Sequence, residues 1–240
     1  MNITITNPQD FSQKSAELVS QKIIELQKDP QKSVNLVLAT GNTMVGFLDS
    51  LSKESGIDWD RVRAFHLDEY KGLSIDHPAS FAYFLNKNLL SKVSIPAENI
   101  NYINGANPDL AAYMAKIKNT GGADIVMLGI GMDGHLGFNE PPFYSHFDGR
   151  MGEVDLTQST IEANKIDYPE IVENHYAFSM GMADIFEGKT LFFLANKARK
   201  AEIVAKALQG PVTEEVPGSI LQNHPDVVVV LDQEAASLLK

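Results

Sequence analysis

The stretch GMDGHLGFNEP at residues 131–141 places Asp133, His135 and Glu140 within eight residues of one another. A histidine beside two carboxylates can be held in one tautomer with its basicity raised, so that it acts as a base or an acid on a hydroxyl group. The glycines of this stretch let the backbone turn back and approach a ligand closely, and the following prolines fix its exit. The pattern therefore predicts three titratable groups converging on one substrate.

Three other interpretations of the same stretch compete with proton transfer. Gly129, Gly131 and Gly134 spell G-x-G-x-x-G after an apolar run, the pattern that cradles a dinucleotide pyrophosphate. That fingerprint must open a helix directly, whereas LGFNEPP follows here, and the nearby carboxylates would repel a pyrophosphate. A metal site with one histidine and two carboxylates is the second alternative, although H-x-x-x-x-E on a loop matches no metal motif. In the third, Asp133 and Gly134 only form a turn and His135 is a satisfied polar residue.

The segment FHLDEY at residues 65–70 offers a second candidate for acid–base chemistry. Asp68 and Glu69 stand just beyond a predicted strand, so one carboxylate can point into the crevice while its neighbour points away. A desolvated carboxylate in that position can serve as a general base. An isolated acidic pair more commonly caps the following structure or solvates a turn, and that alternative stays open here.

The loop ATGNT at residues 39–43 is a candidate anion-binding site. A glycine among small hydroxyl and amide residues, between a buried strand and a helix, offers backbone N–H groups at the positive end of a helix dipole. A turn with an N-cap residue is the alternative. The candidate phosphate ligands are Thr40, Gly41, Asn42 and Thr43.

The net charge limits the classes of partner. The 20 Lys and Arg residues stand against 31 Asp and Glu, a formal charge of −11, which repels nucleic-acid backbones and anionic lipid headgroups. We therefore expect a small-molecule substrate, and neither nucleic-acid nor membrane partners. If that substrate is an anion, cationic groups must hold it locally. The segment ANKARKAE (195–202) supplies Lys197, Arg199 and Lys200, which are either phosphate ligands or a solvated helix face.

Length and composition indicate one globular unit. The 240 residues are 44% hydrophobic and 21% charged, ordinary for a soluble protein, and we expect a single domain over residues 1–240. The absence of cysteine excludes disulfides, thiolate metal sites and a cysteine nucleophile. The N-terminus lacks the pattern of a signal peptide, and no apolar run approaches 18 residues, so we expect a cytoplasmic protein.

Short apolar, β-branched runs alternate along the chain with longer amphipathic segments. Consecutive apolar positions are typical of parallel strands covered on both faces. The alternation predicts a doubly wound α/β fold, with a mainly parallel sheet and helices on both faces, that binds ligands beyond the carboxyl ends of its strands. The irregular part near residues 142–175 is predicted to be an active-site lid. The expected strands are 34–40, 62–67, 99–103, 124–131, 190–196 and 226–232, and the expected helices 8–28, 43–55, 79–91, 108–120, 198–210 and 233–240.

Together these stretches resemble the glucosamine-6-phosphate deaminase family, also called glucosamine-6-phosphate isomerase, which shares its fold with 6-phosphogluconolactonases. The resemblance covers most of the chain, and LDEY and GHLGFNEP are its most specific parts. The related lactonases lack the FNEP ending, so Glu140 favours the deaminase side. The other matching segments are LATGNT, HPASFAYF, IPAENI, NGANPDL, GGADIVMLGIG, the KAE of the basic segment and PGSILQNHPDVVVVLD.

The resemblance implies an aldose–ketose isomerisation coupled to loss of ammonia, without a metal or another cofactor. Asp68 aligns with the base that moves a proton between C2 and C1, and His135 with the group that opens the sugar ring. Asp133 and Glu140 align with the carboxylates of its relay. The loop at 39–43 matches the family's phosphate loop, and Lys200 matches its phosphate-contacting lysine.

The chain departs from the family pattern in three places. Met44 stands where proline is expected, and the segment STIEANKI has Ile161 and Ile166 in place of two arginines. One of those arginines normally closes on the substrate phosphate, so Lys165 is our candidate replacement, with less oriented binding than a guanidinium gives. The basic residues of an activator site in some members are also missing, with Gly152 and Val154 in their place. We expect no such activation.

Four functions therefore stay open at this point. The first is deamination of glucosamine 6-phosphate to fructose 6-phosphate, and the second is the same reaction on the galactosamine epimer. The third is a 6-phosphogluconolactonase-like hydrolysis in which His135 activates water. The fourth is a non-catalytic sugar-phosphate sensor. The sequence leaves open whether the protein is a monomer or a homo-oligomer.

Overall fold

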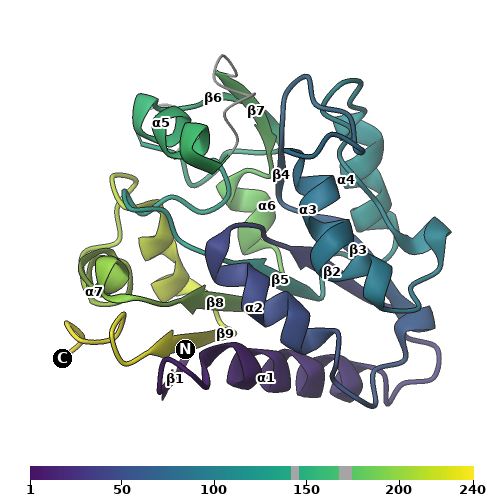
Figure 1. Cartoon of the computed structure of the whole chain (residues 1–240), viewed down its shortest axis with the longest axis horizontal. Coiled ribbons are helices and arrows are strands. Elements are labelled where there is room, and N and C mark those ends of the chain that lie inside the picture. Colours follow the sequence, from purple (N-terminus) through teal and green to yellow (C-terminus); the bar gives the residue numbers. More distant parts are fainter. Residues whose placement is uncertain (142–145, 168–174) are drawn as a thin grey trace.

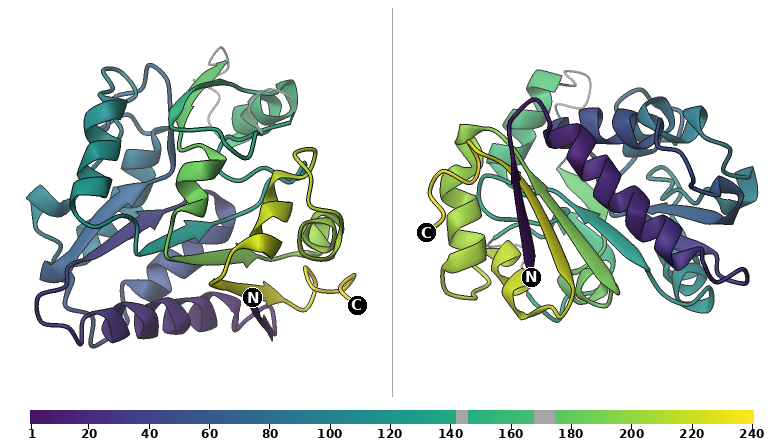
Figure 2. Two further views of the ribbon diagram at one scale, coloured as in Figure 1. Left: turned by 180° about the vertical axis from the view of Figure 1, so that it is seen from behind. Right: turned by 90° about the horizontal axis from the view of Figure 1, so that it is seen from below.

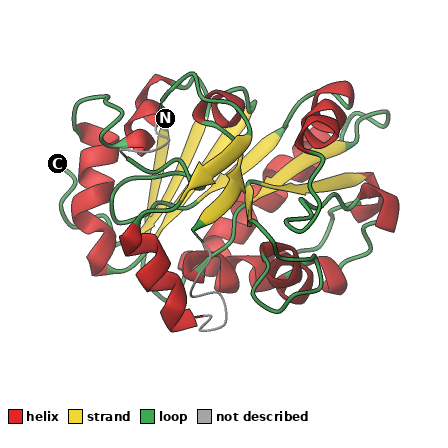
Figure 3. Cartoon of the chain, turned by 90° about the horizontal axis from the view of Figure 1, so that it is seen from above, coloured by secondary structure: helices red, strands yellow, loops and turns green. Residues whose placement is uncertain are grey.

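Six parallel strands form the central sheet of the computed structural model, which describes residues 1–141, 146–167 and 175–240. The order across the sheet is β1-β9-β8-β5-β2-β3, and every neighbouring pair is parallel. Helices lie on both faces of this sheet (Figure 3), so the predicted doubly wound, mainly parallel α/β fold is confirmed. The strands are β1 (Asn2–Thr6), β2 (Val34–Leu38), β3 (Val62–His66), β5 (Ile125–Leu128), β8 (Thr190–Ala195) and β9 (Val227–Asp232).

The middle strands are buried along their whole length. Every residue of β2, β5 and β8 is buried, as their consecutive apolar residues predict for strands that helices cover on both sides. The main hydrophobic core lies on the two faces of these strands, and the largest fully buried side chains are aromatic or aliphatic. This rigid layer fixes the loops that leave its carboxyl edge.

Amphipathic helices cover the sheet, with α1 packed against α2. Side-chain caps begin two helices: the Ser80 hydroxyl accepts the N–H of Tyr83, and the Asp109 carboxylate accepts the N–H of Ala112. None of the helices in the described residues is long and apolar enough to cross a membrane. The helices are α1 (Phe11–Leu26), α2 (Asn42–Leu51), α3 (Phe81–Asn88), α4 (Leu110–Asn119), α5 (Gln158–Asp167), α6 (Met182–Phe186) and α7 (Ala201–Gln209).

The strand order reverses between β2 and β5. From β2 the chain adds β3 on one side, and from β5 it continues through β8 to β9 on the other. The loops that leave β2 and β5 therefore diverge and open a crevice at the carboxyl edge, the usual ligand site of doubly wound sheets. The loops 39–43 and 129–140 flank this crevice.

A second, antiparallel sheet stands next to the first and was not predicted from the sequence. It has the order β4-β7-β6, with β4 (Asp68–Tyr70), β7 (Tyr176–Ser179) and β6 (Gly152–Asp155). In Figure 1 it lies at the top of the molecule, near α5. Only one residue separates the end of β3 from the start of β4, so the sequence FHLDEY crosses from one sheet to the other.

Three predicted or missed elements need correction. Residues 99–103 form no strand: a short 3-10 helix ends at Asn99, and Ile100 makes a single bridge to Ala64. Residues 233–240 form turns, not a helix. Strand β1 was missed, and it pairs with β9 as the edge strand, with the N-terminal strand (purple) beside the C-terminal one (yellow) in Figure 2.

The predicted lid near residues 142–175 falls partly outside the described residues, namely at 142–145 and 168–174. Its described part is more regular than predicted, since it holds β6 and α5.

Candidate active site

The loop 131–140 is a tight turn built around His135. The N–H of Gly131 donates to the carbonyl oxygen of His135 over 3.0 Å. The imidazole lies so close to the Gly131 backbone that a Cβ there would meet a ring atom at 2.3 Å. Only glycine leaves room for the ring in this position, which explains one glycine of the G-x-G-x-x-G pattern without a dinucleotide. No helix follows in residues 129–141, and the dinucleotide-binding interpretation is therefore rejected.

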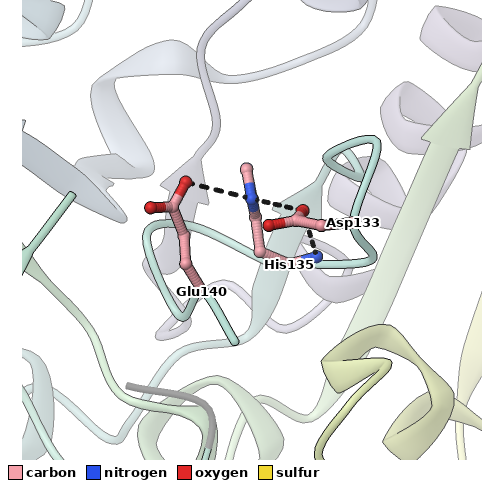
Figure 4. A group of neighbouring side chains, drawn as sticks. All are labelled: Asp133, His135 and Glu140. Carbon is pink, nitrogen blue, oxygen red and sulfur yellow. Dashed lines mark hydrogen bonds and ion pairs between the residues drawn. The ribbon is translucent and has the colours of Figure 1, made fainter. Parts of the chain in front are cut away.

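His135 lies between the two carboxylates of its own loop (Figure 4). Its Nδ1 is 2.7 Å from Oδ1 of Asp133 and 3.3 Å from Oε1 of Glu140. The backbone N–H of His135 also donates to Asp133 Oδ1, over 3.2 Å. Two acceptors at Nδ1 favour the tautomer with the proton on that nitrogen, which leaves Nε2 as the acceptor for a substrate proton.

The two carboxylates raise the basicity of this histidine. Burial opposes the charged imidazolium, but the hydrogen bond and charge of Asp133 and the charge of Glu140 outweigh it, so the pKa of His135 is raised. Burial likewise acts to raise the pKa of Asp133, but the His135 hydrogen bond and charge dominate, and the pKa is lowered. The pair is thus set for a stable carboxylate beside a strong imidazole base.

The three candidate metal ligands, Asp133, His135 and Glu140, lie close together, with their ligand atoms within 4.8 Å of one another. The contact of 2.7 Å between His135 and Asp133 is nevertheless shorter than the separation of about 3.3 Å between two ligands of a tetrahedral zinc ion. It has the length of a close ion pair between an imidazolium and a carboxylate. The geometry therefore favours proton transfer.

Asp68 faces this relay from the small sheet. It begins β4 opposite Ser179 of β7, and it is buried. A Cβ at Gly137 would lie 3.4 Å from Oδ2 of Asp68 and 3.0 Å from the Ser179 hydroxyl, so the loop 131–140 passes directly beside the carboxylate. Burial raises the pKa of Asp68 to about 7, although the charge of His135 opposes the rise.

The neighbouring carboxylate of Glu69 has a different task. Its oxygens accept the backbone N–H groups of Tyr70, Phe81 and Ala82 over 2.9 to 3.0 Å, at the start of α3. Glu69 therefore anchors a helix N-terminus. The capping interpretation is therefore confirmed for Glu69, and Asp68, which lies beside the loop 131–140, stays the candidate base.

The predicted anion-binding groups meet at the other side of the crevice. Gly41 is the N-cap of α2 with φ of +100°, and a Cβ there would have no atom within 4 Å, so the space beside it is open. Asn42 begins α2, Thr40 precedes Gly41, and the Thr43 hydroxyl donates to Asn196 Oδ1 over 3.0 Å. This bond ties the loop after β2 to the loop after β8.

Lys200 reaches the same edge from the opposite side. It ends a short 3-10 helix, and its Nζ donates to the carbonyl oxygen of Ile130 over 2.5 Å. Burial, with the charge of Arg199, lowers the pKa of Lys200 to about 8. Lys165 lies in α5, but its side chain is outside the described part of the structure.

The comparisons with known proteins agree with this arrangement. A family model for glucosamine-6-phosphate isomerases and 6-phosphogluconolactonases matches residues 6–230. The chain belongs to this family. A curated glucosamine-6-phosphate deaminase of Thermoanaerobacter pseudethanolicus is 38% identical over 248 residues, covering 100% of this chain and 95% of that protein. One from Clostridium botulinum is 38% identical over 246 residues, covering 99% and 98%.

Solved structures of the family separate the two branches. A monomeric glucosamine-6-phosphate deaminase superposes with a TM-score of 0.90 at 33% identity, covering 99% of this chain and 100% of that one. The 6-phosphogluconolactonase of Trypanosoma brucei superposes with a TM-score of 0.78 at 18% identity, covering 100% and 98%, which shows a shared fold.

Three residues that depart from the family pattern pack in apolar cores. Met44 is fully buried in the main core, so this residue of α2 contributes packing. Ile161 is buried in a second apolar cluster with Tyr70 and Phe138, and Val154 lies in the same cluster. Ile161 and Val154 thus support the small sheet.

Sequence reasoning missed several residues of the site. Ser179 pairs with Asp68 in the small sheet. Asn196 accepts a hydrogen bond from Thr43, 153 positions earlier in the chain. Thr160 donates a hydrogen bond to Glu140. A single serine, asparagine or threonine carries no sequence signal of its own. Asn196 is the last residue of the predicted strand 190–196 and directly follows β8, and this position at a carboxyl end is the one clue that could have identified it.

Proposed function

We propose that this family member is a glucosamine-6-phosphate deaminase, which converts glucosamine 6-phosphate and water into fructose 6-phosphate and ammonia. The curated relatives at 38% identity over the whole chain support this activity. One structural observation supports it most: two separate acid–base groups, Asp68 and the flanked His135, face one crevice from different sheets and loops. An isomerase of a cyclic amino sugar needs both.

The imidazole acts first in the proposed reaction. With Nδ1 held by Asp133 and Glu140, Nε2 can take the proton of the anomeric hydroxyl and return it to the ring oxygen, which opens the pyranose. The charge that develops on the imidazole is balanced by the two carboxylates beside it.

Asp68 then moves a proton between carbon atoms. Its carboxylate removes the proton from C2 of the open-chain sugar and returns it to C1, which gives a ketose imine through an enolamine. Water hydrolyses the imine at C2 and releases ammonia. A buried carboxyl with a pKa of about 7 holds and releases a proton with comparable ease at neutral pH, as this shuttle requires.

We further propose that the substrate phosphate binds at Thr40, Gly41, Asn42 and Thr43 with Lys200, and that Lys165 contributes from α5. The start of α2 directs its dipole and free N–H groups toward an anion, and Lys200 adds a charge in an otherwise acidic protein. Under this proposal the phosphate of the small-molecule substrate anchors it in the site, and the described part of the predicted lid, residues 146–167, belongs to the same domain and covers the crevice.

Ammonia release is the direct test. Purified protein is mixed with glucosamine 6-phosphate or galactosamine 6-phosphate, and the variants Asp68→Asn and Asp60→Asn are assayed in parallel. Asp60 is exposed and precedes the amino end of β3, whereas Asp68 follows its carboxyl end, so Asp60 controls for the substitution itself. We expect release with the wild type and Asp60→Asn, and a loss of at least about 10³-fold with Asp68→Asn.

The other outcomes identify the alternatives. Faster release from the galactosamine compound would assign the epimer. No release from either sugar would overturn the deaminase proposal. Hydrolysis of 6-phosphogluconolactone that survives Asp68→Asn would then indicate a lactonase, and thermal stabilisation by sugar phosphates without turnover would indicate a sensor.

A further inference from the structure

Glu140 is the most deeply buried member of the relay, and its hydrogen bonds lead to α5. Its carboxyl group is fully buried. Oε2 accepts the backbone N–H of Thr157 over 2.7 Å, and Oε1 accepts the hydroxyl of Thr160. Oε1 is also the atom that lies 3.3 Å from Nδ1 of His135. The oxygen that faces the imidazole is therefore the one that Thr160 holds.

Thr157 directly precedes α5, and Thr160 lies in the first turn of that helix. The Thr157 hydroxyl accepts the N–H of Thr160 over 3.3 Å, and its carbonyl oxygen accepts the N–H of Ile161 over 3.0 Å, so Thr157 acts as the N-cap. A carboxylate at this end of a ten-residue helix is stabilised by the helix dipole and the free N–H groups. The Glu140 carboxyl group is thus held by the first turn of α5, through residues 17 and 20 positions further along the chain.

The same turn is anchored to the segment that carries Asp68. Ile161, next to Thr160, packs in the second apolar cluster with Tyr70 and Phe138. Tyr70 lies two residues after Asp68, and Phe138 lies two residues before Glu140. The first turn of α5 therefore contacts both segments of the acid–base site through neighbouring residues.

We propose that Thr157 and Thr160 are positioning residues that hold the Glu140 carboxylate against the His135 imidazole, so that the relay is complete only while the first turn of α5 is docked. The inference adds to the proposed function a dependence of ring opening on α5. The mechanism needs a carboxylate fixed beside Nδ1, and apart from His135 itself no residue of the loop 131–140 donates a hydrogen bond to the Glu140 carboxylate in the described structure. The first turn of α5 supplies both hydrogen-bond donors, the N–H of Thr157 and the hydroxyl of Thr160.

Other charged groups near the imidazole set the background for this effect. Asp133 contacts Nδ1 from the same loop, Lys200 acts on His135 from the segment before α7, and Asp68 faces it from β4. None of these contacts involves α5. Among the groups near the imidazole, a change confined to Thr160 therefore alters the support of Glu140, together with a hydrogen bond of 3.3 Å from the Thr157 hydroxyl within the same turn.

The test uses Thr160→Val, which keeps the shape of the side chain and removes the hydroxyl, with Thr160→Ser as the rescue. Ser159→Ala is the matched control, because Ser159 lies on the same turn and its hydroxyl contacts Thr157 but not Glu140. The His135 imidazole is titrated by NMR in the free protein, and Glu140→Gln sets the limit for loss of the carboxylate. Ammonia release is measured over pH in parallel.

We expect Thr160→Val to lower the His135 pKa in the direction of Glu140→Gln, and to lower kcat by about tenfold with little change in KM. Thr160→Ser should restore both values, and Ser159→Ala should match the wild type. A His135 titration in Thr160→Val that equals the wild type would overturn the proposal. Because the titration needs no substrate, a protein that shows the shift but releases no ammonia would contradict the proposed function and not this inference.

Discussion

Buried carboxylates lie both at the amino edge of the central sheet, where its strands begin, and at the carboxyl edge, where they end. The groups that surround these carboxylates differ between the two edges. At the amino edge, Asp124 precedes β5 and is 1% exposed. Its Oδ1 contacts Nζ of Lys32 at 2.6 Å and Nζ of Lys189 at 2.8 Å, and its Oδ2 accepts the N–H of Asn35 over 2.9 Å. At the carboxyl edge, Asp68 makes no ion pair and accepts no hydrogen bond from any described residue.

The difference teaches that burial alone does not mark a functional carboxylate. Two ammonium groups and a backbone N–H surround the Asp124 carboxylate, so it ties β2, β5 and β8 together. Asp68 is desolvated with only the charge of His135 to offset its burial, which costs stability and leaves a group that can accept and release a proton. Asp124 therefore stabilises the amino edge, whereas Asp68 leaves a carboxyl group at the carboxyl edge that can exchange a proton.

The largest expected effect is on the pH dependence of stability. The pKa of Asp68 is about 7 in the folded protein, against 3.8 for an ordinary aspartate, so between these pH values the folded state binds a proton that the unfolded state has released. Stability therefore falls as pH rises through this window, by up to about 4 kcal/mol from this one group. Asp68→Asn removes that part of the slope.

Urea unfolding of wild type and Asp68→Asn at pH 4 to 8 measures the effect. The difference in unfolding free energy between the two proteins should change in favour of the variant as pH rises. Asp60→Asn should follow the wild type. Parallel curves for wild type and Asp68→Asn would show that Asp68 is compensated like Asp124, and the contrast between the edges would be lost.

A smaller effect is expected for Gly131→Ala, which tests how tightly the carboxyl edge is built. The added Cβ would lie within 2.6 Å of three ring atoms of His135, so the imidazole must move away from the carboxylates. We expect kcat to fall by about 10²-fold, which corresponds to about 2.7 kcal/mol. Gly129→Ala is the control, because its Cβ would make an ordinary contact at 3.5 Å with Met44. Wild-type kcat in Gly131→Ala would refute the proposed position of the ring.

Asp124→Asn tests the amino edge and should have the opposite signature. Loss of the charge breaks two ion pairs, but both lysines reach solvent, with side-chain exposures of 24% and 53%, so neither is left as a buried charge. We expect a loss of about 2 kcal/mol in unfolding free energy and no change in kcat of the folded enzyme. Measurement by urea unfolding and by ammonia release per folded molecule decides this. A lower kcat with unchanged stability would place Asp124 in the reaction.

The sequence predicted the central sheet well and its periphery poorly. Runs such as VNLVL and TLFFLA are buried at every position and apolar at all but Asn35 and Thr190, which is typical of a strand covered on both faces. Strand β1 was missed because its apolar Ile3 and Ile5 are exposed, against the usual pattern. The strands DEY and GEVD are too short and polar to be seen, and they exist because β7 pairs with both.

The same distinction applies to the site. Asp133, His135 and Glu140 lie within eight residues, so local sequence predicted their contact. Asp68 could be predicted as a candidate but not separated from Glu69, because that choice depends on α3, whose first N–H groups bind Glu69. The link from Thr160 to Glu140 depends on the docking of a helix 20 residues away, which no local pattern encodes.

The smallest predicted effect concerns strain at the carboxyl edge. Lys197 has φ of +75° and ψ of 145°, and it is the one non-glycine residue with positive φ in the described part of the chain. The Asp232 carboxylate accepts its N–H over 3.0 Å, and the adjacent Asn196 accepts from Thr43, so the surroundings hold this conformation. At the carboxyl edge the fold thus tolerates backbone strain at Lys197 as well as the buried carboxylate of Asp68.

Glycine adopts this conformation without strain, so Lys197→Gly should raise the unfolding free energy by about 1 kcal/mol, after allowing for the greater flexibility of glycine in the unfolded chain. Lys197→Ala keeps the strain and should not stabilise. If the Lys197 ammonium also contacts the substrate phosphate, both variants should raise KM equally, because both remove the cation. Urea unfolding and KM for the phosphorylated sugar thus separate backbone from charge. Equal unfolding free energies for the glycine and alanine variants would show that the backbone at Lys197 is not strained.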